Sequence, residues 1–380
     1  MSLQRQRAPA SSLRVGLLCA TLIALAACGS AGATDTASPS AATRIASPAV
    51  TPASPANSSS TDRPDASMAP SASANPTPTP ALVKIEGSIR VQNPVGLAVS
   101  GDAVWAPTST GAVRIDSRTN ALTAIKFGSG NDEIDGITAD ESAAWVTDFD
   151  ASMVYRIDSK TLRVVAQIPV GLNPEEIFST PDAVWVANHR DGTVSRIDPH
   201  SNRVAATIKI GPTGPSGPQW VAVGLGSVWV SVPSIDSVVR IDAQSNSILA
   251  TIVGAHGGIA VSNDVVWVVQ EHSAARIDPK TNQIVATVDI GGDANDPAVI
   301  GNAPWFVVAH PGSPGNLVRI DPATNQVDRV LRLLDEGGST PLELSDATLA
   351  RTTAAKSLWI ADLSEPGQVF RVPIAAISGQ

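Results

Sequence analysis

Histidine and carboxylate side chains scattered along the chain are the residues best able to do chemistry. Four of the five histidines (His189, His256, His272 and His310) lie beside short apolar stretches rich in Val, Ile and Trp. Near neutral pH a histidine can act as a general base or bind a metal ion. Glu271 directly precedes His272. These residues form a site only if the fold brings their segments together.

A tryptophan repeat supplies the elements that would position them. Six of the seven repeated tryptophans are followed by Arg-Ile-Asp, and the spacing is about 40 residues with a longer last interval. The repeated tryptophans are Trp105, Trp145, Trp185, Trp229, Trp267, Trp305 and Trp359. Around Trp185, residues 184–188, 193–198 and 204–208 alternate or are β-branched, which indicates β-strands. With a leading strand ahead of each tryptophan, every unit has four strands, which is one propeller blade.

The fold predicted from this repeat is an all-β, seven-bladed propeller of four-stranded antiparallel blades, over residues 81–380. The last unit ends early, near Pro373, so it needs a donor strand. Residues 82–85 and 88–91 are expected to supply the outer strand of that last blade. The long interval before Trp359 contains residues 331–334 and the stretch 335–348, an excursion or a degenerate strand, so six or eight blades stay open as alternatives.

The residues shared by all units have structural explanations. A buried indole covers a large apolar area, so one tryptophan per blade can join neighbouring sheets. The Asp of Arg-Ile-Asp begins a turn in which its carboxylate accepts backbone N–H groups, and the Asn that follows tolerates a left-handed conformation. Residues that recur in every unit have a structural role in that unit. We therefore expect function where the units differ.

Loops that lead into each first strand and loops that follow each second strand emerge on one face of a propeller, around one mouth of its channel. Four histidines and several carboxylates fall in these loops. This face is the predicted binding surface. Its candidate residues are Asp135, Asp148, His189, Trp220, His256 and Asp362.

The N-terminal residues indicate where the protein resides. Three arginines precede an apolar run from Val15 to Ala27, the layout of a secretory signal. Residues 25–28, Leu-Ala-Ala-Cys, resemble the lipobox of bacterial lipoproteins. That resemblance implies cleavage after a signal peptide at 1–27, lipidation of Cys28 and anchoring to the outer face of the cell membrane. An ordinary cleaved signal with a stray cysteine is the alternative. Residues 28–80, rich in Ala, Ser, Thr and Pro, are predicted to form a disordered linker.

Composition excludes several classes of function. The formal net charge is −9, and it becomes more negative once the arginine-bearing leader is removed. Such a balance disfavours nucleic acid as a partner, and leaves an unknown protein or small molecule. We find no Gly-x-Ser-x-Gly elbow, no phosphate-binding glycine loop and no Cys/His zinc spacing. No cofactor is expected on this basis.

The blade phrase Val-Trp-Val-Ala-Asn, Val-x-Arg-Ile-Asp-Pro, Thr-Asn resembles bacterial YVTN-type propellers and the streptogramin B lyase family. The lyase resemblance implies a metal-assisted elimination that opens a cyclic depsipeptide at an ester, a carbon–oxygen lyase activity. It implies a histidine base, for which His272 and His310 are the candidates. It also implies magnesium held by carboxylates, for which Glu271, Glu175 and Glu176 are the candidates. That family presents Glu-x-His, whereas Glu271 and His272 are adjacent, so on an extended strand they would point to opposite faces.

The sequence supports three hypotheses of function, each from a different class. The preferred one is a surface-anchored binding or scaffold module that uses the loop face around the channel. The alternative is the streptogramin B lyase-like enzyme, which requires a histidine and carboxylates to converge. A purely structural surface protein would show a mouth whose side chains do not converge.

Overall fold

The structure is a computed structural model that describes residues 78–128, 133–310, 313–344, 347–350, 357–364 and 366–378. Residues 1–27, Cys28 and almost all of the expected linker lie outside the described residues, as does the side chain of His310. The described chain forms β-strands, a short α-helix α1 (Ile374–Ser378) and one turn of 3₁₀-helix at Pro233–Ile235. None of its helices has the length and apolar character needed to cross a membrane.

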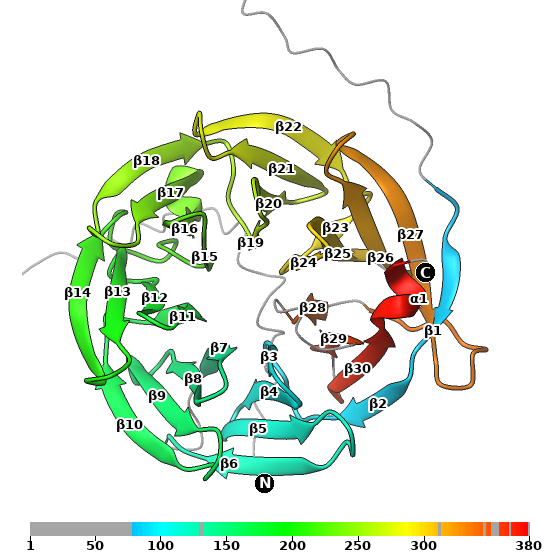
Figure 1. The fold of residues 1–380 in the computed structure, drawn as a ribbon, viewed down its shortest axis with the longest axis horizontal. Coiled ribbons are helices and arrows are strands. Elements are labelled where there is room, and N and C mark those ends of the chain that lie inside the picture. Colours follow the sequence, from blue (N-terminus) through cyan, green and yellow to red (C-terminus); the bar gives the residue numbers. More distant parts are fainter. Residues whose placement is uncertain are drawn as a thin grey trace, which may run out of the picture. The chain divides into compact units, whose positions relative to one another are not determined.

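Seven blades surround a central channel (Figure 1). Five blades have four consecutive antiparallel strands, numbered outward from the channel. They are β3 (Ala98–Ser100), β4 (Ala103–Thr108), β5 (Gly111–Asp116) and β6 (Leu122–Lys126); β7 (Ile134–Ala139), β8 (Ala143–Asp148), β9 (Met153–Asp158) and β10 (Val164–Pro169); β11 (Pro174–Ser179), β12 (Val184–Asn188), β13 (Thr193–Asp198) and β14 (Arg203–Lys209); β15 (Val221–Gly224), β16 (Ser227–Val232), β17 (Ser237–Asp242) and β18 (Ile248–Val253); and β19 (Ile259–Val261), β20 (Val266–Gln270), β21 (Ser273–Asp278) and β22 (Gln283–Asp289).

The last two blades are completed by the N-terminal strands. The sixth has β23 (Asp293–Ala294) and β24 (Ala298–Ile300) against β25 (Ala303–His310), then β26 (Ser313–Asp321), β27 (Gln326–Leu334) and β1 (Ala81–Lys84). The seventh has β28 (Ala347–Leu349), β29 (Ser357–Asp362), β30 (Gln368–Pro373) and β2 (Gly87–Arg90). The predicted fold class and blade number are thus confirmed, and six or eight blades are excluded.

Ring closure agrees with the prediction for one N-terminal strand and differs for the other. Strand β2 pairs antiparallel with β30, as expected for the outer strand of the last blade. Strand β1 instead pairs parallel with β27 and becomes an additional outer strand of the preceding blade. The reason is that residues 331–334 extend β27 and present a partner for residues 81–84. The stretch after Leu334 is an excursion, which returns through a bridge between Leu334 and Pro341.

The repeated tryptophans lie between adjacent blades, and each is at most 2% exposed. Trp145 packs with Val184, Val186 and Ile197 of the next blade. Trp359 packs with Val104 of the first blade, so the same contact closes the ring. Burial of an aromatic side chain this large contributes several kcal/mol, about 25 cal/mol for each Å² removed from water. The predicted role of these tryptophans in joining sheets is confirmed by this packing.

The repeated arginine links neighbouring blades. The guanidinium of Arg156 lies 4.9 Å from the ring centroid of Trp145 in its own blade. Its Nη1 donates to the Pro199 carbonyl at 2.7 Å and to Asn202 Oδ1 at 2.8 Å in the next blade. Arg240 and Arg276, in later blades, make the corresponding contacts. Arg371 donates to the Ser117 carbonyl across the closure.

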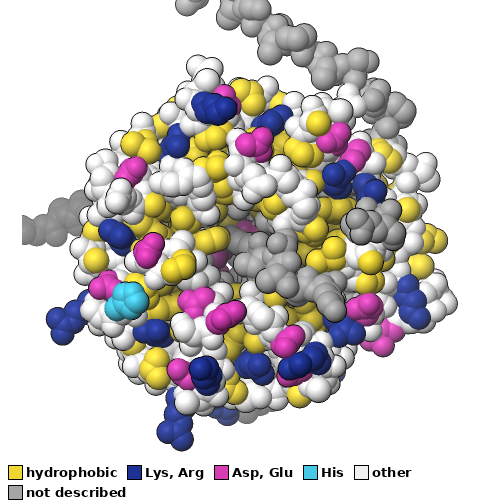
Figure 2. All heavy atoms as spheres, viewed as in Figure 1, with side chains coloured by type: hydrophobic (Ala, Val, Ile, Leu, Met, Phe, Trp, Pro, Cys, Tyr) yellow, Lys and Arg dark blue, Asp and Glu magenta, His cyan; other side chains and the backbone are white. Residues whose placement is uncertain are grey.

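The turns that follow Arg-Ile-Asp have the predicted geometry. Asp158 Oδ1 accepts the backbone N–H of Thr161 at 2.7 Å and its hydroxyl at 2.8 Å. The Asn that ends the turn has a positive φ, for example 55° at Asn202 and 56° at Asn282. These turns lie at the ends of third strands, on the face opposite the loops expected to carry function. On the face shown in Figure 2, acidic and basic side chains are interspersed around the rim rather than gathered by sign.

Candidate functional site

The loops before the first strands and after the second strands lie together, because backbone hydrogen bonds join them. The N–H of His189, after β12, donates to the Asn173 carbonyl before β11 at 2.9 Å. The N–H of Phe149, after β8, donates to the Glu133 carbonyl before β7 at 2.8 Å. We call this side of the propeller the loop face. It is the face on which the sequence places the candidate residues.

Two β-bulges orient the acidic side chains at the channel. Register shifts between Ile134 and Ile137 in β7, and between Pro174 and Ile177 in β11. A bulge inserts an extra residue and redirects side chains, and it is common beside functional sites. Gly136 lies in the first bulge, where a Cβ atom would approach the Glu175 carbonyl oxygen to 2.5 Å. The absence of a side chain at 136 therefore lets the two bulged strands approach closely.

A buried hydroxyl ties these bulges together. Thr147 is fully buried, and its Oγ1 accepts the Gly136 N–H and donates to the Glu175 carbonyl, both at 2.7 Å. Glu175 belongs to the next blade, so one side chain connects the backbones of both bulges. Ser231, in the second strand of a later blade, has a similar role, because its Oγ accepts the Gly257 N–H at 2.7 Å. Buried polar links of this kind fix backbone positions, because leaving them unmade is costly.

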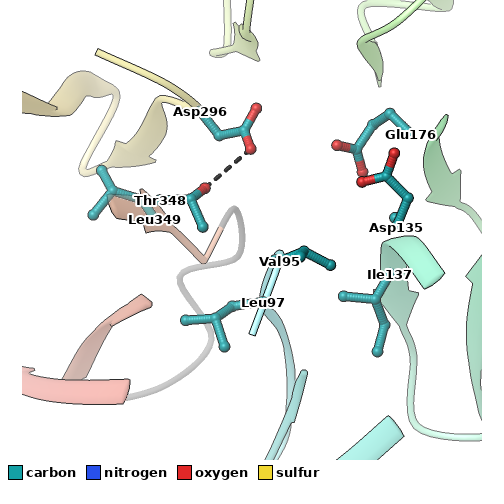
Figure 3. A pocket seen from close by; sticks show the side chains of 10 residues that line it. Val95, Leu97, Asp135, Ile137, Glu176, Asp296, Thr348 and Leu349 are labelled. Atoms are coloured by element: carbon teal, nitrogen blue, oxygen red, sulfur yellow. Dashed lines mark hydrogen bonds between the residues drawn. The ribbon is translucent and has the colours of Figure 1, made fainter. Parts of the chain in front are cut away.

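A pocket in the channel joins carboxylates from three blades (Figure 3). Asp135 and Glu176 extend from neighbouring first strands with their carboxylates close to one another, and Asp296 lies on the other side of the pocket. Thr348 donates its hydroxyl to Asp296 Oδ2 at 3.0 Å. The three carboxylates are each partly exposed. The apolar part of the lining comes from Val95, Leu97, Ile137 and Leu349. Leu97, Ile137 and Leu349 are buried, so the accessible lining of the pocket is mainly polar and acidic.

Glu175 and His189 form a pair next to that pocket. His189 Nδ1 lies 3.3 Å from Glu175 Oε1, and the two side chains are only 7% and 11% exposed. The His189 ring also faces Phe149, with centroids 6.4 Å apart. The pair holds the loop after β12 against β11. Glu175 therefore faces a histidine, while its neighbour Glu176 lines the channel.

Two candidate aspartates are buried and hold their own loops in place. Asp148 is fully buried, and its Oδ1 accepts the Ala151 N–H at 2.9 Å. Asp362 is 8% exposed, and its Oδ1 accepts the Ser364 N–H at 3.1 Å. These contacts organise the turn after the second strand, as aspartates often do. They do not present these carboxylates to a ligand.

His256 and Trp220 of the loop face make different kinds of contact. His256 Nδ1 lies 2.7 Å from Asp236 Oδ1 in a partly exposed pair. Trp220 is partly buried and packs against the core cluster that contains Trp229. Trp220 therefore contributes to the hydrophobic core, which the sequence did not predict.

The dipeptide Glu271-His272 forms the tip of the hairpin between β20 and β21. Its flanking residues Gln270 and Ser273 are paired, and Glu271 has a φ of 27°. His272 is well exposed, and its Nε2 lies 3.1 Å from Asp293 Oδ1 of the next blade. Asp293 pairs in register with Ala309, the residue before His310. The fold thus brings the backbones of the two candidate bases into adjacent blades.

The carboxylates named for magnesium do not gather. Glu175 faces His189, Glu176 lines the pocket and Glu271 lies at an exposed hairpin tip. Among the residues that the structure describes, no three His, Cys, Asp or Glu side chains are grouped so as to hold a metal ion. These residues therefore do not fit the magnesium site that the lyase resemblance implies, and no catalytic step through a metal is derived from them.

Three further aspartates complete the pairs and the pocket: Asp293 and Asp296 are among the carboxylates that the sequence places in the loops of this face, without a partner or role, whereas Asp236 was missed. Asp236 and Asp293 each partner a candidate histidine, and Asp296 supplies the third pocket carboxylate. All three precede or follow predicted strands on the loop face, so the face they occupy could be read from the sequence. Their partners could not, because contacts between blades depend on the ring geometry.

Comparisons with known proteins support the fold. No protein-family model and no curated protein sequence matches the chain. Among solved structures, virginiamycin B lyase from Staphylococcus aureus matches with 16% identity and a TM-score of 0.61, over 76% of this chain and 98% of that chain. A catalytically inactive histidine variant of that lyase with quinupristin matches equally well.

Two further structures extend the comparison. A streptogramin B lyase matches with 15% identity and a TM-score of 0.59, over 75% of this chain and 97% of that one. A chain of a mitotic checkpoint complex matches with 15% identity and a TM-score of 0.60, over 84% and 99%. At such identities the likeness shows the fold alone, and propellers with different roles share it. The predicted resemblance to streptogramin B lyases is confirmed at that level.

Proposed function

We propose that this protein is a surface-anchored, extracytoplasmic binding module whose loop face recognises a cationic ligand or a basic segment of a partner protein. The observation that supports this most directly is the convergence of Asp135, Glu176 and Asp296 on one pocket in the channel. Carboxylates from three blades in a concave site attract positive charge more strongly than separate surface carboxylates, because the walls exclude part of the solvent. An ammonium or guanidinium group is the type of ligand that these three carboxylates would attract.

The direct test is a calorimetric titration with spermidine and with a short lysine-rich peptide. A triple variant, Asp135→Asn, Glu176→Gln, Asp296→Asn, is expected to weaken binding by at least about tenfold, since each carboxylate adds a favourable charge interaction. The matched control removes three exposed carboxylates from turns between first and second strands, on the opposite face: Glu141→Gln, Asp182→Asn, Asp264→Asn. Equal weakening in both triples, or no binding by the unmodified chain, contradicts the proposal.

The anchor is proposed from residues 25–28 and is tested separately. A bacterial cell that expresses the full chain with an alkyne-tagged fatty acid is expected to label it at Cys28. Cys28→Ser is expected to abolish the label and release the protein from the membrane fraction, because one thiol carries the lipid. Labelling that survives this substitution rules out the anchor.

The lyase function is a second candidate, favoured by two observations. The fold matches those of virginiamycin B lyase and streptogramin B lyase. His272 also lies on the loop face with Asp293 positioned to orient its ring. A histidine held by a carboxylate is a suitable base for removing a proton beside an ester.

This candidate is tested by incubating the protein with quinupristin and Mg²⁺. Elimination breaks the ester C–O bond and moves one proton, so the linear product has an unchanged mass and a new chromatographic retention time. Turnover that is lost in His272→Ala would support the lyase. An ion bound at 100 times its dissociation constant would stabilise the fold by about 2.7 kcal/mol, so bound Mg²⁺ should raise the melting temperature. No such rise, together with no product, would exclude the lyase and leave the binding module as the remaining proposal.

A further inference from the structure

The second blade (β7 to β10) and the third blade (β11 to β14) contain the same β-bulge, so their residues can be compared position by position. In each bulge two residues of the first strand lie opposite one residue of the second strand. The paired residues on either side of the bulge are Ile134 with Asp148 and Ile137 with Val146 in the second blade, and Pro174 with Asn188 and Ile177 with Val186 in the third. Asp135 and Glu175 are therefore equivalent as the first residues of their bulges. Phe149 and His189 are equivalent as the first residues after their second strands.

The two equivalent carboxylates lie in different surroundings. Asp135 is partly exposed and lines the channel pocket, with its carboxylate beside that of Glu176 (Figure 3). Glu175 is not among the residues that line this pocket. Its side chain is only 11% exposed, and its Oε1 lies 3.3 Å from His189 Nδ1. The side chain of Phe149 has no polar atom to contact a carboxylate, whereas the imidazole of His189 has ring nitrogens that can do so.

The backbone of His189 is fixed on two sides, so its ring is held where it meets Glu175. The N–H of His189 donates to the Asn173 carbonyl at 2.9 Å. Gly217, in the loop before β15, packs against the His189 carbonyl, because a Cβ atom at 217 would approach that oxygen to 1.7 Å. A buried carboxylate is costly unless another group compensates its charge, and His189 is placed to do this for Glu175.

We propose that His189 is a specificity-determining residue of the channel pocket, because it withholds Glu175 from the lining and limits the pocket to three carboxylates. This inference rests on the proposed cation-binding function. Without the histidine, the bulge of the third blade would present Glu175 as the bulge of the second blade presents Asp135. Each added carboxylate strengthens the attraction for a cation, and most for the cation that carries the most charge. His189 therefore sets which ligand charge the pocket prefers.

His189→Phe tests the proposal by giving the third blade the residue that the second blade has. A buried carboxylate that loses its partner is expected to move into the pocket, since remaining buried would be costly. Calorimetry at neutral pH is expected to show spermine binding that is tighter by about fivefold or more, with a smaller gain for putrescine, which has fewer ammonium groups. The matched control adds Glu175→Gln to His189→Phe, which keeps the altered loop but removes the released charge and the gain. His189→Gln, whose amide can still contact Glu175, is expected to show no gain.

A second pair of variants changes the carboxylate instead of the histidine, and it decides the matter if His189→Phe does not fold. Glu175→Asp shortens the side chain by one carbon–carbon bond, which breaks the contact with His189 and gives the third blade the aspartate that the second blade has at 135. We expect it to tighten spermine binding in the same way. Glu175→Asn has the same shape without the charge, so it is expected to produce no gain.

A crystal structure of the full chain with His189→Phe provides a measurement that needs no ligand. We expect the Glu175 carboxylate to lie in the pocket with those of Asp135 and Glu176. A Glu175 side chain that keeps its buried position overturns the proposal, as do charged variants that bind spermine no more tightly than their matched controls. A result in which no form of the chain binds a polyamine instead contradicts the proposed binding function, and the position of Glu175 in the crystal still decides whether His189 withholds it.

Discussion

At the scale of the residue, the Arg-Ile-Asp repeat has a different role for each of its polar members. The arginine stacks on the tryptophan of its own blade and donates to the next blade, while the aspartate holds the turn. Asn202 and Asn282, which end two of these turns, each adopt a positive φ and accept a hydrogen bond from an arginine of the preceding blade. One blade has Leu162 at this position with a φ of 56°, so leucine can occupy it.

Replacing that asparagine should therefore reveal how much the hydrogen bond contributes. Asn202→Leu is expected to cost about 2 kcal/mol, about half from the left-handed backbone and half from the lost acceptor of Arg156. Asn246→Leu should cost less, because Arg196 is 3.5 Å from Asn246 Oδ1, whereas Arg156 is 2.8 Å from Asn202 Oδ1. Urea denaturation of both variants measures the difference. Equal losses would mean that the arginine contact contributes nothing measurable.

The turn aspartates should make the fold sensitive to acid. The backbone N–H of Thr161 lowers the pKa of the Asp158 carboxyl below its usual value of 3.8. A lowered pKa in the folded state stabilises the fold above the unfolded pKa, and this contribution is lost as pH falls through the lowered value. Asp158→Asn should therefore destabilise the protein at neutral pH and make no difference at the acid end. Denaturation midpoints of both proteins from about pH 7 to about pH 2 check this, and a gap that is constant with pH would refute it.

At the scale of the element, the bulges of β7 and β11 decide where the acidic side chains point. Gly136→Ala is expected to cost about 1 to 3 kcal/mol, because the added Cβ would approach the Glu175 carbonyl to 2.5 Å and force the strands apart. The control is Gly87→Ala in β2, where the nearest atom would be 3.7 Å away and the effect should be neutral or slightly stabilising. Chemical denaturation compares the two. A neutral Gly136→Ala would show that the bulge yields easily.

The same elements show what the sequence could and could not predict. Strands, turns and blade number follow from local patterns, such as alternation around Trp185 and the turn after Asp198, and the structure confirms them. The pocket depends on the bulges of β7 and β11. In a strand without a bulge, side chains alternate, and Glu175 and Glu176 would simply point to opposite faces of the sheet. Nothing in the local pattern indicates that Glu175 meets His189 or that Glu176 meets Asp135. Those contacts arise from how neighbouring blades approach.

At the scale of the whole molecule, the N-terminal strands close the ring twice. Val83 and Ile85 join the core cluster of Trp305, and Ile89 and Val91 join that of Trp359. All four side chains are less than 9% exposed. The chain therefore depends on residues 81–91 to complete its last two blades, although their strand partners lie near the other end of the sequence, which makes these contacts highly non-local.

Removing residues 1–91 should consequently abolish cooperative folding. The four buried side chains contribute about 1.5 to 3 kcal/mol each, which together equals most of the stability of an ordinary domain of about 5 to 15 kcal/mol. A synthetic peptide of residues 81–91 should restore the transition in a concentration-dependent way, because binding to the folded state stabilises it by mass action. A peptide with Ile85→Asp and Ile89→Asp should not, since it would bury unpaired charges. Thermal melts of the truncated chain with each peptide provide the measurement, and a truncated chain that melts like the full chain would show that the ring closes without these strands.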